Sequence, residues 1–151
     1  MRQTRSTPLG GRSAHLSYVG IRVTNLEKSL KFYEGLFGLE EVARGDNSRF
    51  GMGVFVLLRD RKSGQKLELN WYPKGSKYDA PYVAGEGLDH IAFYVDDVEE
   101  KFKRFVAMGA APTDFGPKPP RSYCYVKDPD GNWIELYQSR KRVRRKVSKG
   151  Y

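Results

Sequence analysis

The sequence predicts an α+β domain built from two βαβββ modules. The order strand, helix, strand, strand, strand occurs twice along the 151 residues. The first strand and helix repeat at an offset of 72 residues, with LSYVGIRVTNLEKSL (16–30) over LDHIAFYVDDVEEKF (88–102). The last strands repeat at an offset of 67 residues, with KLEL (66–69) over WIEL (133–136). Self-similarity of this kind indicates duplication of one supersecondary unit, in which the helix covers one face of the sheet.

The first module is predicted over residues 15–73. Its helix is expected to begin at Thr24, because Glu27 follows three residues later in a capping-box spacing, and to end at Gly38. A loop rich in Gly, Pro, Ser and Tyr follows over 74–87. In chain order, periodicity and turn residues predict a strand over 16–23, a helix over 24–38, and strands over 39–44, 49–60 and 65–73.

The second module is predicted over residues 88–138. Its helix is expected to be capped by Asp96 and Glu99. The turn Asp128-Pro129-Asp130-Gly131 predicts a hairpin, because Pro presets φ, Gly accepts positive φ and Asp side chains bond nearby backbone N–H groups. In chain order, the elements are a strand over 88–95, a helix over 96–109, a short strand candidate within 110–120 and the hairpin over 121–138.

The net charge of +9 belongs to the ends of the chain. Residues 1–13 and 139–151 carry ten basic and no acidic residues, which leaves 17 basic and 18 acidic residues between them. The sequence therefore predicts a flexible basic arm over 1–14 and a basic tail over 139–151. The tail could touch nucleic acid or another acidic surface, but nucleic-acid binding is unlikely because no aromatic interleaving or recognition module accompanies it. A solvated or partner-docked tail is the favoured interpretation.

Composition also limits the cellular compartments in which the protein is expected. No apolar run approaches the ~20 residues that a membrane helix needs, and residues 1–15 lack the apolar region of a secretory signal. A single cysteine, Cys124, excludes an intrachain disulfide and fits a reducing cytoplasm. Cys124 shares a strand face with Val126 and is expected to pack rather than react.

Four polar positions stand out because the repeat pairs them. Tyr18 pairs with His90 at the offset of 72, and Glu68 pairs with Glu135 at the offset of 67. All four lie opposite the core-facing parity of their strands, so they point to the face that the helices leave uncovered. If a pseudo-two-fold axis relates the modules, one imidazole and two carboxylates can converge as a divalent metal site. Hydrogen-bonded burial of the two carboxylates without metal is the alternative.

The same strand faces carry further polar and aromatic residues. They would give a pocket with aromatic walls and few polar groups, which is typical of a small-molecule site. These residues are Arg22, Asn70, Tyr94, Tyr123, Tyr125 and Tyr137.

Four motifs together resemble the vicinal oxygen chelate superfamily. They are VGIRVTNLEKSLKFYEGLFGLE (19–40), KLELNW (66–71), LDHIAFYVDDVEE (88–100) and VKDPDGNWIELYQ (126–138). The superfamily includes glyoxalase I, methylmalonyl-CoA epimerase, fosfomycin-resistance thiol transferases, extradiol dioxygenases and bleomycin-resistance proteins. The resemblance spans about residues 16–138 and is closest to glyoxalase I. It implies an open, cup-shaped, mixed eight-stranded sheet around a metal, with helices on the outer face.

The resemblance to glyoxalase I implies roles for individual residues. Glu68, His90 and Glu135 fall on metal-ligand positions, whereas the first-strand ligand, a His or Gln in the family, falls on Tyr18. A tyrosine there could hydrogen-bond a metal-bound water or the substrate. Arg22 falls on an arginine that helps to bind glutathione.

The implied activity is that of a metal-dependent lyase or isomerase. One divalent ion (Zn, Ni, Mn, Fe or Co) would bind adjacent substrate oxygens and stabilise an enediolate, with Glu135 as proton shuttle and Glu68 as a second catalytic carboxylate. The substrate would be a small molecule, with glutathione or another thiol adduct as a candidate. Cups in this family are often completed between two chains, so a homodimer is expected, with the site either within one chain or across two.

Two other functions are compatible with the same fold. A metal-free binding protein of the bleomycin-resistance type would use the tyrosine-rich pocket to stack on a planar ligand, and Tyr18 at a ligand position favours it. A dioxygenase or thiol transferase is the third candidate. Both of those families normally keep a first-strand histidine, so Tyr18 argues against them.

Overall fold

The computed structural model describes residues 16–46, 53–80, 83 and 88–138. The basic arm predicted over 1–14 and the basic tail predicted over 139–151 lie outside the described residues. So do the start of the strand predicted over 49–60 and most of the end of the predicted loop 74–87.

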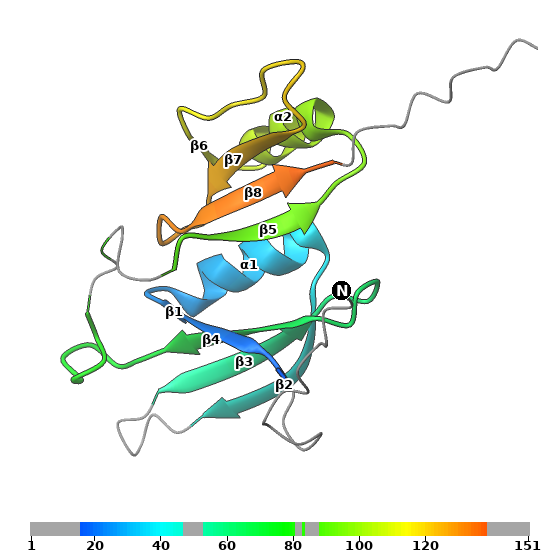
Figure 1. Ribbon diagram of the computed structural model, residues 1–151. Coiled ribbons are helices and arrows are strands. Elements are labelled where there is room, and N and C mark those ends of the chain that lie inside the picture. The colour runs from blue at the N-terminus through cyan, green and yellow to red at the C-terminus, as the bar shows by residue number, and fades with distance from the viewer. Residues whose placement is uncertain (1–15, 47–52, 81–82, 84–87, 139–151) are drawn as a thin grey trace, which may run out of the picture.

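The described chain forms two βαβββ modules in the predicted order (Figure 1). The first module contains β1 (Val19–Val23), α1 (Leu26–Phe37), β2 (Glu40–Asp46), β3 (Val54–Arg59) and β4 (Lys66–Trp71). The second contains β5 (His90–Tyr94), α2 (Val98–Ala107), β6 (Ala111–Pro112), β7 (Tyr123–Lys127) and β8 (Trp133–Tyr137). Neither helix is long and apolar enough to cross a membrane, among the residues described.

The eight strands are divided into two hydrogen-bonded sheets of four. The first sheet has the order β1-β4-β3-β2 and the second has the order β5-β8-β7-β6. In each sheet the first strand runs parallel to the last, and the other pairs are antiparallel, so both sheets are mixed. The predicted α+β class and the predicted modules are therefore confirmed. Neither sheet closes into a barrel, and β1 and β5 are each left at an edge.

The strand registers confirm the internal repeat. Gly20 of β1 is paired with Glu68 of β4, and Ala92 of β5 is paired with Glu135 of β8. These pairs are equivalent at the offsets of 72 and 67 residues that the sequence shows. The duplicated unit has therefore kept its strand register as well as its order of elements.

The core lies on the sheet faces that alternation predicted. Ile134 and Leu136 of β8 are completely buried, as are Cys124 and Val126 of β7. Val56, Leu58 and Leu69 fill the corresponding positions of the first sheet. Phe37 at the end of α1 joins the two modules, because its ring lies 3.9 Å from that of Phe93 and 5.0 Å from that of Phe105, measured between centroids.

Both predicted helix caps were one residue too early. The N-cap of α1 is Asn25, whose side chain accepts a hydrogen bond from the Lys28 N–H, and the N-cap of α2 is Asp97, which accepts from the Glu100 N–H. Thr24 does not cap α1, because its backbone N–H and its hydroxyl both donate to Asp130 in the second module. The predicted end of α1 is confirmed: Gly38 adopts the left-handed conformation with φ 66°.

A polar clasp between the turn 128–131 and α1 fixes how the modules sit together. Asp128 is buried and accepts hydrogen bonds from the Tyr33 hydroxyl at 2.8 Å, from the Asn132 side chain at 2.8 Å, and from two backbone N–H groups of its own turn. Asp130 accepts from Thr24 and, at 3.4 Å, from the Ser29 hydroxyl. Figure 1 shows α1 lying between the two sheets, whereas α2 packs against β7 and β8. Helix α1 therefore serves both modules.

Burial changes the pKa values of two residues of this clasp, Asp128 and Tyr33. Burial raises the pKa of Asp128, while hydrogen bonds from Asn132 and Tyr33 act in the opposite direction. Burial and the neighbouring Asp128 charge raise the pKa of Tyr33, so its hydroxyl remains a donor.

We expect Tyr33→Phe to lower the free energy of unfolding by about 1–3 kcal/mol, because a buried carboxylate loses a hydrogen-bond donor while the ring is kept. Urea unfolding followed by circular dichroism measures this change. The control Tyr78→Phe removes a hydroxyl from a tyrosine that is 42% exposed, and we expect a change within about 0.5 kcal/mol. Equal stability of the two variants would show that the clasp does not hold the modules.

We expect the folded protein to resist thiol reagents. Burial raises the pKa of the Cys124 thiol to about 11; Glu135 adds to the rise and Arg121 opposes it. At pH 8 only about one such thiol in a thousand is ionised, so Ellman's reagent should react far more slowly than with free cysteine. Unfolding in guanidinium should release one reactive thiol per chain. Rapid reaction without loss of the folded signal would contradict the packing of β7.

Candidate functional site

The second sheet brings His90 and Glu135 together. His90 opens β5 and Glu135 lies in the middle of β8, opposite Ala92. Both side chains are on the sheet face opposite the buried Ile134 and Leu136, as alternation predicted. The His90 Nε2 atom lies 3.3 Å from Glu135 Oε2, and the two side chains are 33% and 19% exposed. Ala92, the residue paired with Glu135, carries only a methyl group.

Asp89 contacts the ring nitrogen of His90 that faces away from Glu135. Its carboxylate Oδ1 lies 2.5 Å from His90 Nδ1. A proton on Nδ1 satisfies this contact and leaves the Nε2 lone pair directed toward Glu135. A carboxylate behind the non-ligating nitrogen is a common way to orient a metal-binding imidazole. His90 and Glu135 together therefore present one nitrogen and one oxygen donor, which suit a divalent metal ion.

The first sheet holds the equivalent carboxylate, Glu68. It lies in β4 between Gly20 of β1 and Leu57 of β3, and it is half-buried. The Asn70 side chain donates a hydrogen bond of 3.1 Å to Glu68 Oε1. A Cβ atom at Gly20 would come within 3.1 Å of Asn70 Nδ2 and 3.6 Å of Glu68 Oε1. Glycine at this position therefore gives the pair its room, and Asn70 orients Glu68.

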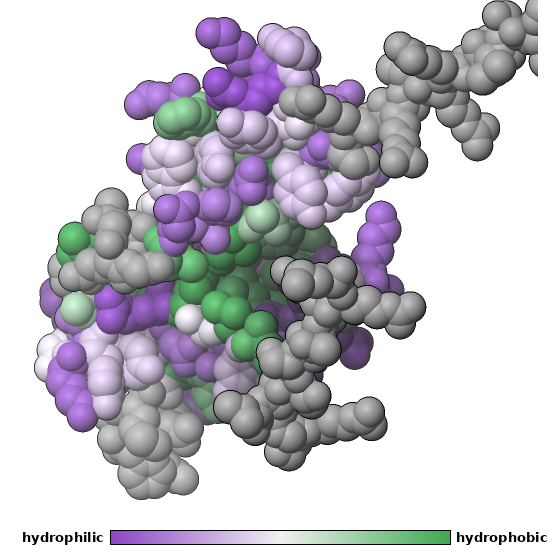
Figure 2. Space-filling view, in the orientation of Figure 1, coloured by the Kyte–Doolittle hydropathy of each residue, from purple (hydrophilic) through white to green (hydrophobic). Residues whose placement is uncertain are grey.

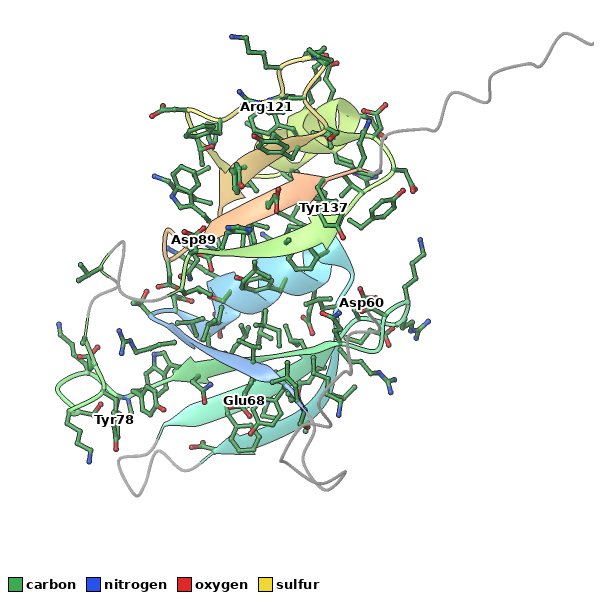
Figure 3. All side chains as sticks on the ribbon, in the orientation of Figure 1. Asp60, Glu68, Tyr78, Asp89, Arg121 and Tyr137 are labelled. Carbon is green, nitrogen blue, oxygen red and sulfur yellow. The ribbon has the colours of Figure 1, made fainter. Side chains whose placement is uncertain are left out.

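The predicted ligands are divided between the two modules. His90 and Glu135 are adjacent on the second sheet, whereas Glu68 lies on the first sheet, and α1 lies between the sheets (Figure 3). Within residues 16–46, 53–80, 83 and 88–138, no three His, Cys, Asp or Glu side chains are grouped closely enough to hold a metal ion. Tyr18 precedes β1 and is 45% exposed. One chain thus offers a ligand pair and, separately, a third carboxylate.

Aromatic rings extend from the His90–Glu135 pair across the second sheet. Tyr125 is paired with Glu135, and its ring lies 5.6 Å from the His90 ring. Trp133 lies 5.3 Å and Tyr123 lies 6.1 Å from Tyr125, and Phe115 lies 5.8 Å from Trp133, measured between ring centroids. We call these four residues, Phe115, Tyr123, Tyr125 and Trp133, the aromatic row. Burial and the nearby Glu135 charge raise the pKa of the Tyr125 hydroxyl.

Three residues in or beside this row, Phe115, Arg121 and Trp133, were not predicted as site residues, although alternation along β8 places Trp133 on the same face as Glu135. Phe115 and Arg121 lie in the connection between β6 and β7, where no strand periodicity indicates which way a side chain points. Phe115 is held in place because its carbonyl accepts a hydrogen bond of 3.0 Å from the Tyr125 N–H. Two predicted tyrosines, Tyr94 and Tyr137, lie on the same face, with their rings edge to face at 5.6 Å.

Two pockets adjoin residues of the candidate site. A pocket of about 330 Å³ at the end of β1 and β4 is bordered by Arg22, Lys74 and the rings of Trp71, Tyr72 and Tyr78. Arg22 is paired with Asn70, so this pocket adjoins the Glu68 surface. A larger hollow of about 940 Å³ lies between the modules, and Figure 2 shows hydrophobic side chains there. Its lining includes Val19, Phe93 and His90.

Comparison with known proteins agrees with the fold and with the motifs. A family model described as the Glyoxalase/Bleomycin resistance protein/Dioxygenase superfamily matches residues 15–136. A lactoylglutathione lyase from Neisseria meningitidis is 34% identical over 133 residues, which cover 83% of this chain and 91% of the relative.

Solved structures show the same architecture. The trypanothione-dependent glyoxalase I from Leishmania major is 27% identical, with a TM-score of 0.68 over 83% of this chain and 87% of that chain. A fosfomycin resistance protein from Listeria monocytogenes, solved with Mn(II) and a dihydroxypropylphosphonic acid, has a TM-score of 0.64 at 20% identity over 85% of this chain and 95% of that chain. The motifs, the fold and these matches together establish that the chain belongs to the glyoxalase/bleomycin resistance protein/dioxygenase superfamily.

Proposed function

We propose that the protein is a glyoxalase I-like, metal-dependent lyase or isomerase that acts on a small substrate with adjacent oxygen atoms. The adjacent donors His90 Nε2 and Glu135 Oε2, with Asp89 behind the imidazole, are the observation that carries the proposal. The relatives named lactoylglutathione lyase support a thiol adduct, such as one of glutathione, as the substrate.

The donor set fits a divalent ion. His90 and Glu135 would hold it from the second sheet, and Glu68 would add a third ligand from a first sheet. When bound, such an ion supplies Lewis acidity toward adjacent substrate oxygens. Imidazole and carboxylate ligands are compatible with Zn, Ni, Mn, Fe and Co, so the residues do not distinguish among these metals.

The residues of the chain perform the remaining tasks. Glu135 takes a proton from one substrate carbon and returns it to the neighbouring carbon, which is a net isomerisation without loss of atoms. Asn70 holds the Glu68 carboxylate in one orientation. Arg22 borders the smaller pocket and binds an anionic group of the substrate. Tyr125, which is paired with Glu135 across the strands, contributes its ring to the wall of the site.

We further propose that the site is completed in a homodimer, with Glu68 from one chain and the His90–Glu135 pair from its partner. The separation of these residues within one chain supports the proposal. So do the sheet edges: among the described strands, β1 and β5 each pair on one side only, and Val19 on β1 is 47% exposed. Edge strands with exposed apolar residues favour association with another chain.

A metal-free binding protein remains the second candidate. The aromatic row beside His90 is the observation that favours it, because stacked rings can hold a planar ligand without any metal. Purified protein that lacks metal, yet is stabilised against heat by planar organic ligands, would support this candidate over the lyase.

We expect Glu135→Gln to remove both metal and activity. The amide keeps the shape of the side chain but loses the charge that binds a cation and accepts a proton, so the rate should fall about 10²–10⁴-fold. Metal content is measured by mass spectrometry on protein purified without chelator. Activity is measured with a hemithioacetal of glutathione.

The matched control is Glu99→Gln, which makes the same change at an exposed position on α2. It should leave metal content and rate unaltered. Wild-type protein without a stoichiometric divalent metal would overturn the proposed lyase.

Mixing two inactive variants tests the cross-chain site. In a heterodimer of Glu68→Gln and Glu135→Gln chains, a cross-chain arrangement makes one site doubly mutant and the other fully wild type. Random pairing should therefore restore about a quarter of the wild-type activity and metal content. If each site belonged to one chain, every site would carry a mutation and nothing would be restored. A monomer by sedimentation, or a dimer without restoration, would contradict the proposal.

A further inference from the structure

Arg121 is a cation that stands over aromatic rings. Its guanidinium carbon lies 5.4 Å from the centroid of the Tyr123 ring and 5.8 Å from that of Phe115. Among the described residues, no carboxylate forms an ion pair with it. Figure 3 shows Arg121 above β7, at the upper end of the second sheet. A guanidinium held over rings in this way keeps N–H groups available for an anion.

The aromatic row connects this cation to the proposed metal ligands. Tyr123 lies under Arg121, and Tyr125 lies two residues further along β7, opposite Glu135. Two residues of an antiparallel strand span about 7 Å. Trp133 and Phe115 flank Tyr125, so the rings form a continuous surface between the cation and the carboxylate.

Two of the four rings of this row are exposed, and the other two, Tyr125 and Trp133, are half-buried. Phe115 is 46% exposed and Tyr123 is 40% exposed, whereas the residues that alternate with the row on β7 and β8, such as Cys124 and Ile134, are completely buried. The row therefore does not belong to the core, since α2 packs against these strands and the core lies on the other face. A partly exposed patch of rings, with a cation at its end that no described carboxylate pairs with, has the composition of a ligand surface.

We propose that the aromatic row and Arg121 form a subsite for a planar aromatic group that carries a carboxylate. The ring of the ligand contacts the row, and its carboxylate accepts hydrogen bonds from Arg121. The proposal rests on the proposed function in one respect: the reacting part of the substrate would lie at Glu135, where the row begins. It names the chemical class of the group that the reacting carbons carry on the side away from the thiol.

Calorimetric titration of the full chain tests the subsite without requiring turnover. The probe is 2-naphthoate, and the comparison ligands are 2-naphthalenemethanol, which lacks the charge, and hexanoate, which lacks the ring. Each titration is done on protein as purified and again after treatment with EDTA, so that binding of the carboxylate to a metal is recognised. We expect saturable binding of 2-naphthoate in both preparations, and weaker binding of the two comparison ligands.

Two variants distinguish the contribution of the Arg121 charge to binding from that of the aromatic rings. Arg121→Gln should weaken 2-naphthoate about tenfold and leave 2-naphthalenemethanol unchanged, because only the charged hydrogen bonds are lost. Phe115→Leu keeps an apolar side chain but removes a ring, so it should weaken both aromatic ligands. The control Arg104→Gln makes the same charge change at an exposed position on α2 and should alter nothing.

Several results would overturn the subsite. They are the absence of saturable 2-naphthoate binding, hexanoate binding as tightly as 2-naphthoate, binding lost on EDTA treatment, or equal effects of the two arginine variants. The ligand comparison needs only wild-type protein, so it remains decisive if a variant fails to fold. Because EDTA-treated protein is used, loss of the lyase proposal and loss of the subsite are separate outcomes.

Discussion

The arrangement of the two modules depends on a buried carboxylate in a tight turn. Asp128 is 4% exposed and accepts four hydrogen bonds, one of them from Tyr33 on α1. A buried charge without such partners would be strongly destabilising, and α1 supplies the one partner that lies outside the turn, the Tyr33 hydroxyl. Asp130 in the same turn binds the residues around the start of α1, where the positive end of the helix favours a carboxylate. A local turn of the second module thus becomes the joint with the first.

This joint has a consequence for the site. Because α1 lies between the sheets, Glu68 stays on one side of the joint and the His90–Glu135 pair stays on the other. Moving them together within one chain would break the hydrogen bond from Tyr33 to Asp128 and the contact between Phe37 and Phe93. Association of two copies along the free edges of β1 and β5 requires no such rearrangement. The cross-chain proposal is therefore the one that keeps the observed fold intact.

Periodicity and repetition predicted what depends on local sequence. Alternation predicted the strand faces on which Glu135 and Glu68 lie. The repeat predicted that the two carboxylates occupy equivalent positions in their modules. The helix caps were displaced by one residue because the capping signal does not distinguish adjacent polar residues. In addition, the Thr24 hydroxyl donates a hydrogen bond to Asp130, 106 residues away. Contacts of that range leave no trace in a local pattern, and for the same reason the position of α1 between the sheets and the orientation of Arg121 were not predictable.

The two modules share one strand register but differ in the side chains at equivalent positions of the proposed site. In the second, His90 and Glu135 form a donor pair, and Asp89 orients the imidazole. In the first, the position equivalent to His90 is Tyr18, and Glu68 is oriented by Asn70 instead. A tyrosine is a poor replacement for an imidazole ligand, so under the proposed function the first module would supply one metal donor and the second would supply two. Each module also carries an arginine near its proposed ligand residues. This is Arg22 in the first module and Arg121 in the second. A substrate in the proposed cross-chain site would then meet an anion-binding group on either side of the metal ligands, which favours substrates with negative charge at both ends.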